Sequence, residues 1–427
     1  MDLSHWWGIF SARFRGVGER RSHATEPPTP TAISIRPPHQ VRAPNQEEST
    51  RVTTYEPFDL FIAPAVDGYQ TRVIASLHGE AAAKFHLPES IATQRDHLRM
   101  VGGAIRAFKL VGASAPTAQP LDPQQFGAQL FTALFAGAVG TCWRQSLALA
   151  EREGKGLLLR LRLDEVPELA ALPWEYLYDP VRQHYLVLTG QTPVVRYLSL
   201  PAAEAPMTVD GPLHILVLTA DAADYARLNI VAEEARLRTA LQPLEAQGRV
   251  AVTWLANGTL ADLRRALRRG DHHILHFIGH GWFEQEGSYT DNGLLLVDEE
   301  GNGLKVGAET LGMHLHNHRA LRLAFLNACE GARLAGDEGE PFGGVAQQLV
   351  QQGLPAVIAM QFPISDRAAI ELTRAFYSSL AAGNPVDAAL TSARSAVYAQ
   401  ESVMEWGTPV LFMRSANGRL WSPGVHG

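Results

Sequence analysis

Beyond residue 209 the chain alternates short apolar runs with longer amphipathic segments, which predicts strands that alternate with helices. The predicted strands are 213–219, 250–255, 273–278, 321–327, 356–360 and 410–413. The predicted helices are 231–247, 260–269, 343–352, 365–382 and 385–398. Apolar strands between amphipathic helices are typical of an α/β fold with a mostly parallel sheet and helices on both faces. A small accessory strand is predicted over 293–298.

The preceding region, 53–208, has a different pattern and predicts a smaller α+β domain. Apolar runs on either side of Asp67 and Gly68 predict two paired strands, at 58–62 and 71–77. The other predicted elements are one long helix over 124–153, a half-exposed strand over 156–163, and strands near 185–188 and 193–198. Prolines at 201, 206 and 212 mark the boundary, so the second domain is predicted to cover 209–427.

Residues 1–52 lack the pattern of a folded domain. Between about residues 20 and 52 the segment is rich in Pro, Ser, Thr and charge, which predicts a disordered linker. A short aromatic and basic segment precedes it, with Trp6, Trp7, Phe10 and Phe14 beside Arg13 and Arg15. Docking of this segment on a partner or a membrane surface is one interpretation, and a frayed terminus is the favoured one.

Composition narrows the class of protein. The 427 residues carry a net charge of −7, so bulk charge gives no argument for direct nucleic-acid binding. The only cysteines are Cys142 and Cys329, which excludes a disulfide framework and favours a cytoplasmic location. No apolar stretch reaches the roughly 18 residues of a membrane span, and the N-terminus does not resemble a secretory signal.

The chemistry centres on His280 and Cys329, each expected at the carboxyl end of its own apolar strand. Carboxyl ends of parallel strands form the rim that carries active sites in α/β sheets. A thiol becomes a good nucleophile when a nearby imidazole takes its proton. The separation of 329 − 280 = 49 residues is close to the roughly 50 of the caspase-type arrangement. The backbone N–H groups of Gly281 and Cys329 are the predicted oxyanion hole.

Other candidate groups are weaker. Asp298 or Glu299 would orient His280, although surface carboxylates are common. On a strand, His314, His316 and His318 would share one face and suit zinc, but a solvated loop is favoured and no metal is predicted. Helix-dipole compensation is favoured over an anion site for a basic helix end that comprises Arg264, Arg265, Arg268 and Arg269. Serine-hydrolase, phosphate-loop and dinucleotide motifs are absent, so no cofactor is predicted.

Seven separate segments carry a further signal: 171–179, 276–281, 326–331, 353–360, 362–366, 375–380 and 387–390. In combination and in this order they resemble the CHAT domain, a bacterial branch of the caspase/separase-like peptidases. The resemblance covers roughly 155–414 and implies a caspase-like sheet with His280 as base and Cys329 as nucleophile. It further implies a cysteine endopeptidase that cleaves a protein partner, in bacterial defence or regulated cell death.

The resemblance leaves specificity and activation open. It implies that Asp224 lies near a specificity pocket, and the amide Asn327 argues against a strong preference for basic residues. Asp366 is expected either to line the cleft or to cap the following helix. Residues 1–150 lack the 34-residue repeats of many family members, so activation is expected from another protein, self-association or the tail. The acidic, glycine-rich loop 332–341 is a candidate for cleavage on activation. The alternative function is a catalytically silent scaffold.

Overall fold

The structure is a computed structural model of the chain. It describes residues 54–91, 122–198, 200, 205–225, 230–255, 257–286, 289–329, 341–362, 364–400 and 404–423. The predicted N-terminal aromatic segment and its linker lie outside these ranges, as does the loop 332–341 apart from Pro341.

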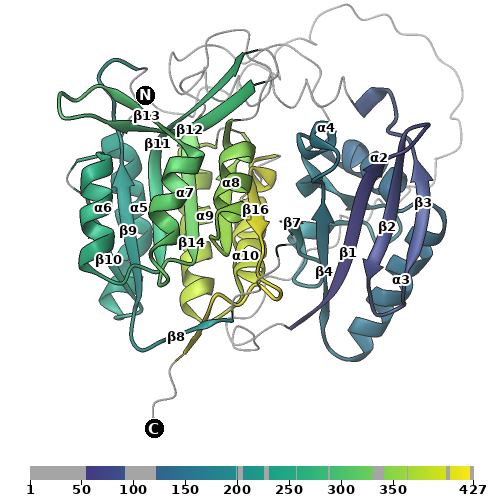
Figure 1. Ribbon diagram of the computed structural model, residues 1–427. Helices are drawn as coiled ribbons and strands as arrows, with labels where there is room; N and C mark the ends of the chain where they lie inside the picture. Colours follow the sequence, from purple (N-terminus) through teal and green to yellow (C-terminus); the bar gives the residue numbers. More distant parts are fainter. Residues whose placement is uncertain are drawn as a thin grey trace, which may run out of the picture. The chain divides into compact units, whose positions relative to one another are not determined.

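One sheet runs through the described part of the chain, in the order β10-β9-β11-β14-β15-β16-β7-β4-β1-β2-β3 (Figure 1). The strands before the predicted boundary at 208/209 are β1 Tyr55–Pro64, β2 Tyr69–Ala75, β3 Ala81–Phe85, β4 Gly156–Arg162 and β7 Val194–Tyr197. Those after it are β9 Leu213–Thr219, β10 Val250–Trp254, β11 Ile274–Glu286, β14 Leu323–Cys329, β15 Ala356–Met360 and β16 Pro409–Met413. The sheet is continuous across that boundary, because β7 pairs with β16.

Helices cover both faces of the strands that follow β9 (Figure 1). One face packs against α5 Ile230–Ala246, α9 Asp366–Ala381 and α10 Val386–Tyr398. The other face packs against α6 Leu260–Arg269, α7 Ala308–His316 and α8 Pro341–Gln351. Alternate strand residues supply the two cores; Ile278 and Phe325 belong to the first, Phe277 and Leu326 to the second. The predicted α/β fold with a mostly parallel sheet is confirmed.

The sheet consists of two groups of parallel strands that run in opposite directions. The strands β10, β9, β11, β14 and β15 are parallel, and so are β16, β7, β4 and β1. The two groups join through an antiparallel pair, β15 with β16, whereas the sequence pattern predicted a parallel strand at 410–413. Two helices, α9 and α10, connect β15 to β16, and they pack against each other on one face. An even number of helices brings the chain back pointing the opposite way, which explains the reversal.

The first strands form the predicted hairpin. β1 pairs antiparallel with β2 around the turn at Gly68, whose φ of +79° lies in the region that glycine favours. The predicted half-exposed strand 156–163 is instead almost entirely buried as β4. Its arginines are accommodated because Asp59 of β1 receives Arg160 Nη1 at 3.1 Å and Arg162 Nη2 at 2.9 Å.

The predicted long helix 124–153 is two helices, α2 Pro123–Leu134 and α3 Gly137–Arg152, which meet at 104°. The break falls at Gly137, whose φ is +53°. A Cβ at Gly140 would lie 2.1 Å from the Phe135 carbonyl oxygen, so the sharp turn requires glycine there as well. In the described ranges no single helix has the length and apolar character to cross a bilayer, and only this bent pair meets both criteria together.

The remaining small elements flank the sheet. They are β5 Tyr178–Asp179, β6 His184–Tyr185, β8 Met207–Val209 and β17 Trp421–Pro423, with the short helices α4 Pro167–Ala170, η2 Trp174–Tyr176, η3 Leu186–Leu188 and η4 Glu405–Gly407. The predicted strand near 185–188 is therefore mostly a 3-10 helix. The strands β12 Tyr289–Val297 and β13 Gly303–Gly307 extend from β11 as an antiparallel arm, and β12 includes residues 293–297 of the predicted accessory strand.

Candidate active site

The backbones of His280 and Cys329 lie directly opposite each other in neighbouring parallel strands. The ladder between β11 and β14 runs from Ile274 opposite Leu323 to His280 opposite Cys329, which is the last pair. Successive positions of a strand alternate between the two faces of a sheet. Phe325 belongs to the core beneath α5 and α9, so position 329 falls on that same face, as does position 280 by alternation from Ile278. The fold thus brings the two predicted residues to one place and one face.

His280 is not at the end of its strand, contrary to the sequence-based prediction. β11 continues to Glu286. Its pairing with β9 ends at Ile278, and from His280 onward β11 pairs with β12, with Leu295 opposite His280. His280 is consequently flanked by a strand on each side and is only 2% exposed. Gly281 is likewise inside the strand, opposite Leu294, rather than in a turn. The apolar run ended at His280 because one face of the arm is polar, so the sequence pattern hid its continuation.

A second layer of aromatic side chains lies under this pair. His276 stacks on Phe325 with ring centroids 4.8 Å apart and an angle of 8° between the planes. These two residues are opposite each other in the same ladder, four positions before His280 and Cys329. The His276 Nδ1 atom is 2.8 Å from the Tyr377 hydroxyl of α9. Burial lowers the pKa of His276 to about 3, so this histidine is neutral at physiological pH and fixes strands rather than carrying charge.

Asp224 lies in the loop after β9 and holds the antiparallel arm. Its Oδ1 atom accepts a hydrogen bond of 2.7 Å from the backbone N–H of Gly303, the first residue of β13. The Ala223 N–H donates to the Gly301 carbonyl beside it at 3.0 Å. The residue is exposed, and the contacts connect the end of β9 to the arm that flanks His280. Its assignment to substrate binding stays a prediction.

The two other residues predicted to bind substrate are Asn327 of β14 and Asp366 of α9. Asn327 is a half-buried residue of β14, opposite Ile278 and two positions before Cys329. Asp366 is the first residue of α9, and Arg236 of α5 forms an ion pair with its carboxylate. The helix cap itself is Ser365, whose hydroxyl accepts from Ala368 N–H, so Asp366 is not the N-cap. Substrate contacts by either residue stay predictions.

The carboxylates and histidines that the sequence raised as weaker candidates have other roles here. Asp298 closes the turn between β12 and β13, where its Oδ1 accepts from Glu300 N–H at 3.0 Å and from Asn302 N–H at 2.8 Å. Glu299 is exposed in the same turn. His314 and His316 belong to helix α7 rather than to a loop or strand, so a two-residue spacing does not place them on one face. Across the part of the chain that the structure describes, no group of three His, Cys, Asp or Glu residues is arranged to hold a metal ion.

Two contacts near the site had no signal in the sequence. Tyr377 binds His276 from a helix 101 residues away, and Arg236 neutralises Asp366 from a helix 130 residues away. Helical periodicity marks positions 377 and 236 only as members of amphipathic helices. Only the packing of α5 and α9 on the same face of the sheet brings them to their partners.

Comparison with protein-family models identifies the family of the chain. The family model for the CHAT domain matches residues 124–422, which is more than half of the chain. The chain belongs to the CHAT domain family. The matched range of this CHAT domain begins at α2 and includes β4 and β7, so the family unit starts well before the predicted boundary at 209. No curated protein matches the sequence.

Solved structures similar to this CHAT domain include cysteine proteases. The Arg-specific cysteine proteinase gingipain R is 14% identical, with 66% of this chain and 68% of that chain covered and a TM-score of 0.40. In the separase–securin complex of Saccharomyces cerevisiae the match is 12% identical, covers 77% of this chain and 22% of that chain, and has a TM-score of 0.35. A complex of the pro- and mature domains of Porphyromonas gingivalis RgpB matches at 12% identity and a TM-score of 0.36, with 78% of each chain covered. Membership of the family rests on the family model and not on these likenesses.

Proposed function

We propose that this CHAT domain is a cysteine endopeptidase that cleaves a protein partner, with Cys329 as nucleophile and His280 as base. The observation that carries the proposal is the ladder of β11 and β14, in which the two residues are opposite each other at the final pair. Neighbouring parallel strands keep their Cα atoms roughly 5 Å apart, which is within the reach of an imidazole for a thiol on the same face.

The proposed reaction follows from the chemistry of the two groups. The imidazole of His280 takes the thiol proton of Cys329, and the thiolate attacks the carbonyl carbon of the scissile peptide bond. The carbonyl oxygen becomes an oxyanion, for which the backbone N–H groups of Gly281 and Cys329 are the proposed donors. The imidazolium then protonates the leaving amine. A water molecule that gives its proton to His280 hydrolyses the thioester and releases the second product.

Rigid support of the base is the contribution of the fold. His280 lies between β14 and β12, and the ring stack of His276 on Phe325 holds β11 against β14 one layer below. Misplacement of a catalytic group by about 1 Å can lower a rate by roughly 100-fold, so this support matters for activity. Asp224, through its bond to Gly303, supports the arm from the other side.

The charges near the proposed cleft favour substrates without a strongly basic residue at the cut. The residue two positions before the nucleophile is the neutral Asn327. The nearby carboxylate of Asp366 is paired with Arg236, so it is not a free anion for a substrate arginine or lysine. Roles in bacterial defence or cell death, activation by a partner or by self-association, and a cytoplasmic location belong to this proposal as predictions.

Labelling with an electrophilic thiol probe, followed by peptide mass mapping, tests the pair. Cys142 is the internal reference, because it is buried in α3 with 3% exposure. We expect Cys329 to react faster than Cys142 in the wild type, and at least about tenfold more slowly in His280→Ala, since general-base assistance contributes that much or more. The exposed His86, replaced in His86→Ala, is the matched control that should leave labelling unchanged.

Endopeptidase activity itself needs a second experiment. New protein N-termini would be compared in cells that express the wild type or Cys329→Ala. Termini that depend on Cys329 and vanish in His280→Ala would support the proposal. Identical termini in all three strains, together with equal labelling of Cys329 with and without His280, would contradict it and leave the scaffold function.

A further inference from the structure

Helix α6 carries four arginines that point in two directions. Its buried face consists of Leu263 and Leu267, and the two flanks carry Arg264 with Arg268 and Arg265 with Arg269. Each pair is spaced i to i+4, so its two members lie one above the other on the helix. The sequence treated these four residues as one basic helix end, and the structure separates them into two pairs with different surroundings.

The first pair faces helix α7 and its C-terminal turn. The Arg264 charge contributes to lowering the pKa of His314, after the larger effect of burial. Arg268 acts in the same way on His318, again after burial. The lowered pKa values keep both imidazoles neutral at physiological pH, so the charge on this side of the helix comes from the two arginines.

The second pair lines a cavity between α6 and the edge of the sheet. The cavity is about 520 Å³, which is in the range of small-molecule sites. Arg265, Ala266 and Arg269 form its helical wall. The other lining residues come from the sheet and the adjoining loops: His214, Thr253, Trp254, Leu255, Asn257, Asp262, Gly270 and His272.

The charges of this wall are unbalanced in favour of an anion. Arg265 is bound to Asp262 at 2.6 Å, and the second oxygen of Asp262 accepts from Asn257 at 3.0 Å. Arg269 has no carboxylate partner among the residues that the structure describes. One guanidinium is thus held in place by an acid while the other lacks a counter-ion.

A buried imidazole also lines the cavity, and one of its two nitrogens has no hydrogen-bond partner among the described residues. His272 is 8% exposed, and it interacts with the Ala266 carbonyl at the end of α6. Its Nδ1 atom is buried and has no hydrogen-bond partner within the described part of the chain. An unsatisfied buried polar atom costs free energy, and this one belongs to a residue of the cavity wall but lies beneath the accessible surface.

We propose that the cavity between α6 and β10 binds a small organic phosphate. Guanidinium groups bind phosphate oxygens in a planar, bidentate manner, and Arg265 and Arg269 present two such groups one helical turn apart. The volume exceeds what a phosphate or pyrophosphate group fills, and Trp254 and Leu255 line the remainder, so the organic part of the ligand lies against them.

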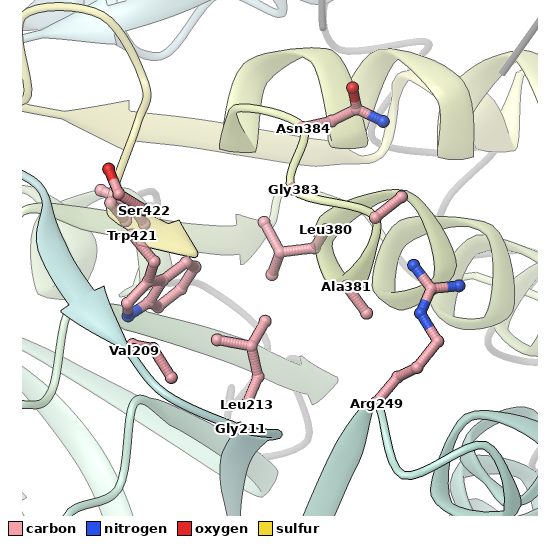
Figure 2. Close-up of a pocket in the computed structure, with 12 residues that line it drawn as sticks. Val209, Gly211, Leu213, Arg249, Leu380, Ala381, Gly383, Asn384, Trp421 and Ser422 are labelled. Atoms are coloured by element: carbon pink, nitrogen blue, oxygen red, sulfur yellow. The ribbon is translucent and has the colours of Figure 1, made fainter. Parts of the chain in front are cut away.

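A second cavity of the molecule shows by contrast what such a site requires. It measures about 180 Å³ and lies near the C-terminal end of α9, as Figure 2 shows. Its walls are mainly apolar, with Leu213, Leu380 and Trp421 facing one another, and Arg249 is the only charged residue that lines it. This cavity therefore offers one guanidinium, whereas two neighbouring guanidinium groups line the cavity at α6.

Calorimetric titration of the full chain tests the proposal, with inorganic pyrophosphate and ADP as probes at constant ionic strength near 0.15 M, where exposed charges are screened. Arg265→Gln/Arg269→Gln removes the cavity pair. The matched control, Arg264→Gln/Arg268→Gln, removes the same charge from the same helix on the side that faces α7. All four side chains are exposed, so both variants should fold, which a thermal melt would verify.

We expect saturable binding of pyrophosphate to the wild type, weakened at least about tenfold in the cavity variant and by less than about threefold in the control. ADP, which carries the same diphosphate, should bind at least as tightly because the organic part contacts Trp254. No saturable binding, or equal weakening in both double variants, would overturn the site. Binding of ADP tenfold weaker than that of pyrophosphate would overturn the assignment of the remaining volume to an organic group.

Discussion

His276 and Phe325 stack face to face across β11 and β14, directly below the level of His280 and Cys329. The stack joins the two strands that carry the proposed base and nucleophile, and Tyr377 attaches it to α9. Because the side chains of all three residues are at most 1% exposed, the stack and its hydrogen bond belong to the core rather than to the surface of the site. They make the geometry of the site depend on packing that is outside the site.

Replacement of Tyr377 by phenylalanine should weaken this support. Tyr377→Phe leaves His276 Nδ1 buried without its partner, which costs about 1–3 kcal/mol of the free energy of unfolding. Urea denaturation would measure the loss. Tyr398→Phe is the matched control, because Tyr398 is 50% exposed and should change stability by less than about 0.5 kcal/mol. Equal effects of the two changes would contradict a structural role for the hydroxyl.

Stability should fall as the pH drops below about 6.5. Burial lowers the pKa of His276 to about 3, and burial together with His214 lowers that of His273 to about 4. The unfolded chain therefore binds protons at these histidines from about pH 6.5 downward while the folded protein does not, so acid favours unfolding. Between pH 6.5 and 4.5 we expect a loss of about 2 kcal/mol per histidine.

A variant isolates the part of this pH dependence that comes from His276. In His276→Phe/Tyr377→Phe the polar pair becomes apolar, and no group at that position titrates. Urea midpoints measured across the same pH range should then decline less steeply than in the wild type. An identical slope in both proteins would show that His276 binds a proton as readily in the fold as in the unfolded chain.

Removal of Glu175 alone should be strongly destabilising. Glu175 and Arg196 form an ion pair of 3.1 Å, with exposures of 1% and 5%. Glu175→Leu leaves a buried guanidinium without its counter-charge, and we expect a loss of about 3–5 kcal/mol. Glu175→Leu/Arg196→Met should recover most of it, because a buried pair and well-packed apolar residues are close in free energy.

The comparison for that prediction is an ion pair on the surface. Arg374 and Glu371 are an i, i+3 pair on α9, and Arg374 is 55% exposed. Arg374→Met should change the free energy of unfolding by less than about 1 kcal/mol, since exposed pairs contribute little. Thermal melts that rank Arg374→Met beside Glu175→Leu would contradict the buried pair's importance.

A methyl group at Gly293 should disturb the arm that flanks His280. A Cβ there would lie 2.0 Å from the Val306 carbonyl oxygen and 2.7 Å from Trp282 Nε1, so β12 and β13 must separate. We expect Gly293→Ala to lower thermal stability and, if the proposed pair acts, to slow labelling of Cys329. Gly190→Ala is the control, because a Cβ there meets no atom within 4 Å. Unchanged labelling in a destabilised Gly293→Ala protein would show that the arm does not position His280.

Much of the sheet after residue 209 could be predicted from apolar runs. β9 and β15 have the bounds that the pattern predicts, and so does α6, because buried parallel strands and amphipathic helices have distinct periods. The pattern predicted both helices between β15 and β16, but periodicity does not give the direction of a strand, so the reversal of β16 was missed. The break between α2 and α3 was missed because apolar residues continue through Gly137.

For the candidate site, the sequence predicted the two central residues but not their setting. The ladder places His280 opposite Cys329, which the strand pattern anticipated. The continuation of β11 past His280 was missed because one face of the arm is polar. The contacts of Asp224 with Gly303 and of Asp366 with Arg236 join residues far apart in the chain, and no local pattern records such pairs.

The pairing of β7 with β16 has a consequence for how the chain folds and how it can be divided. A fragment that starts at residue 209 would retain His280 and Cys329 yet leave β16 with one bare edge, an adhesive surface that invites intermolecular strand addition. Such a fragment would lose the cover of Arg196 over the Phe412 ring as well. The strands before residue 209 therefore cap the edge of β16, and we expect the fragment that lacks them to aggregate where the full chain does not.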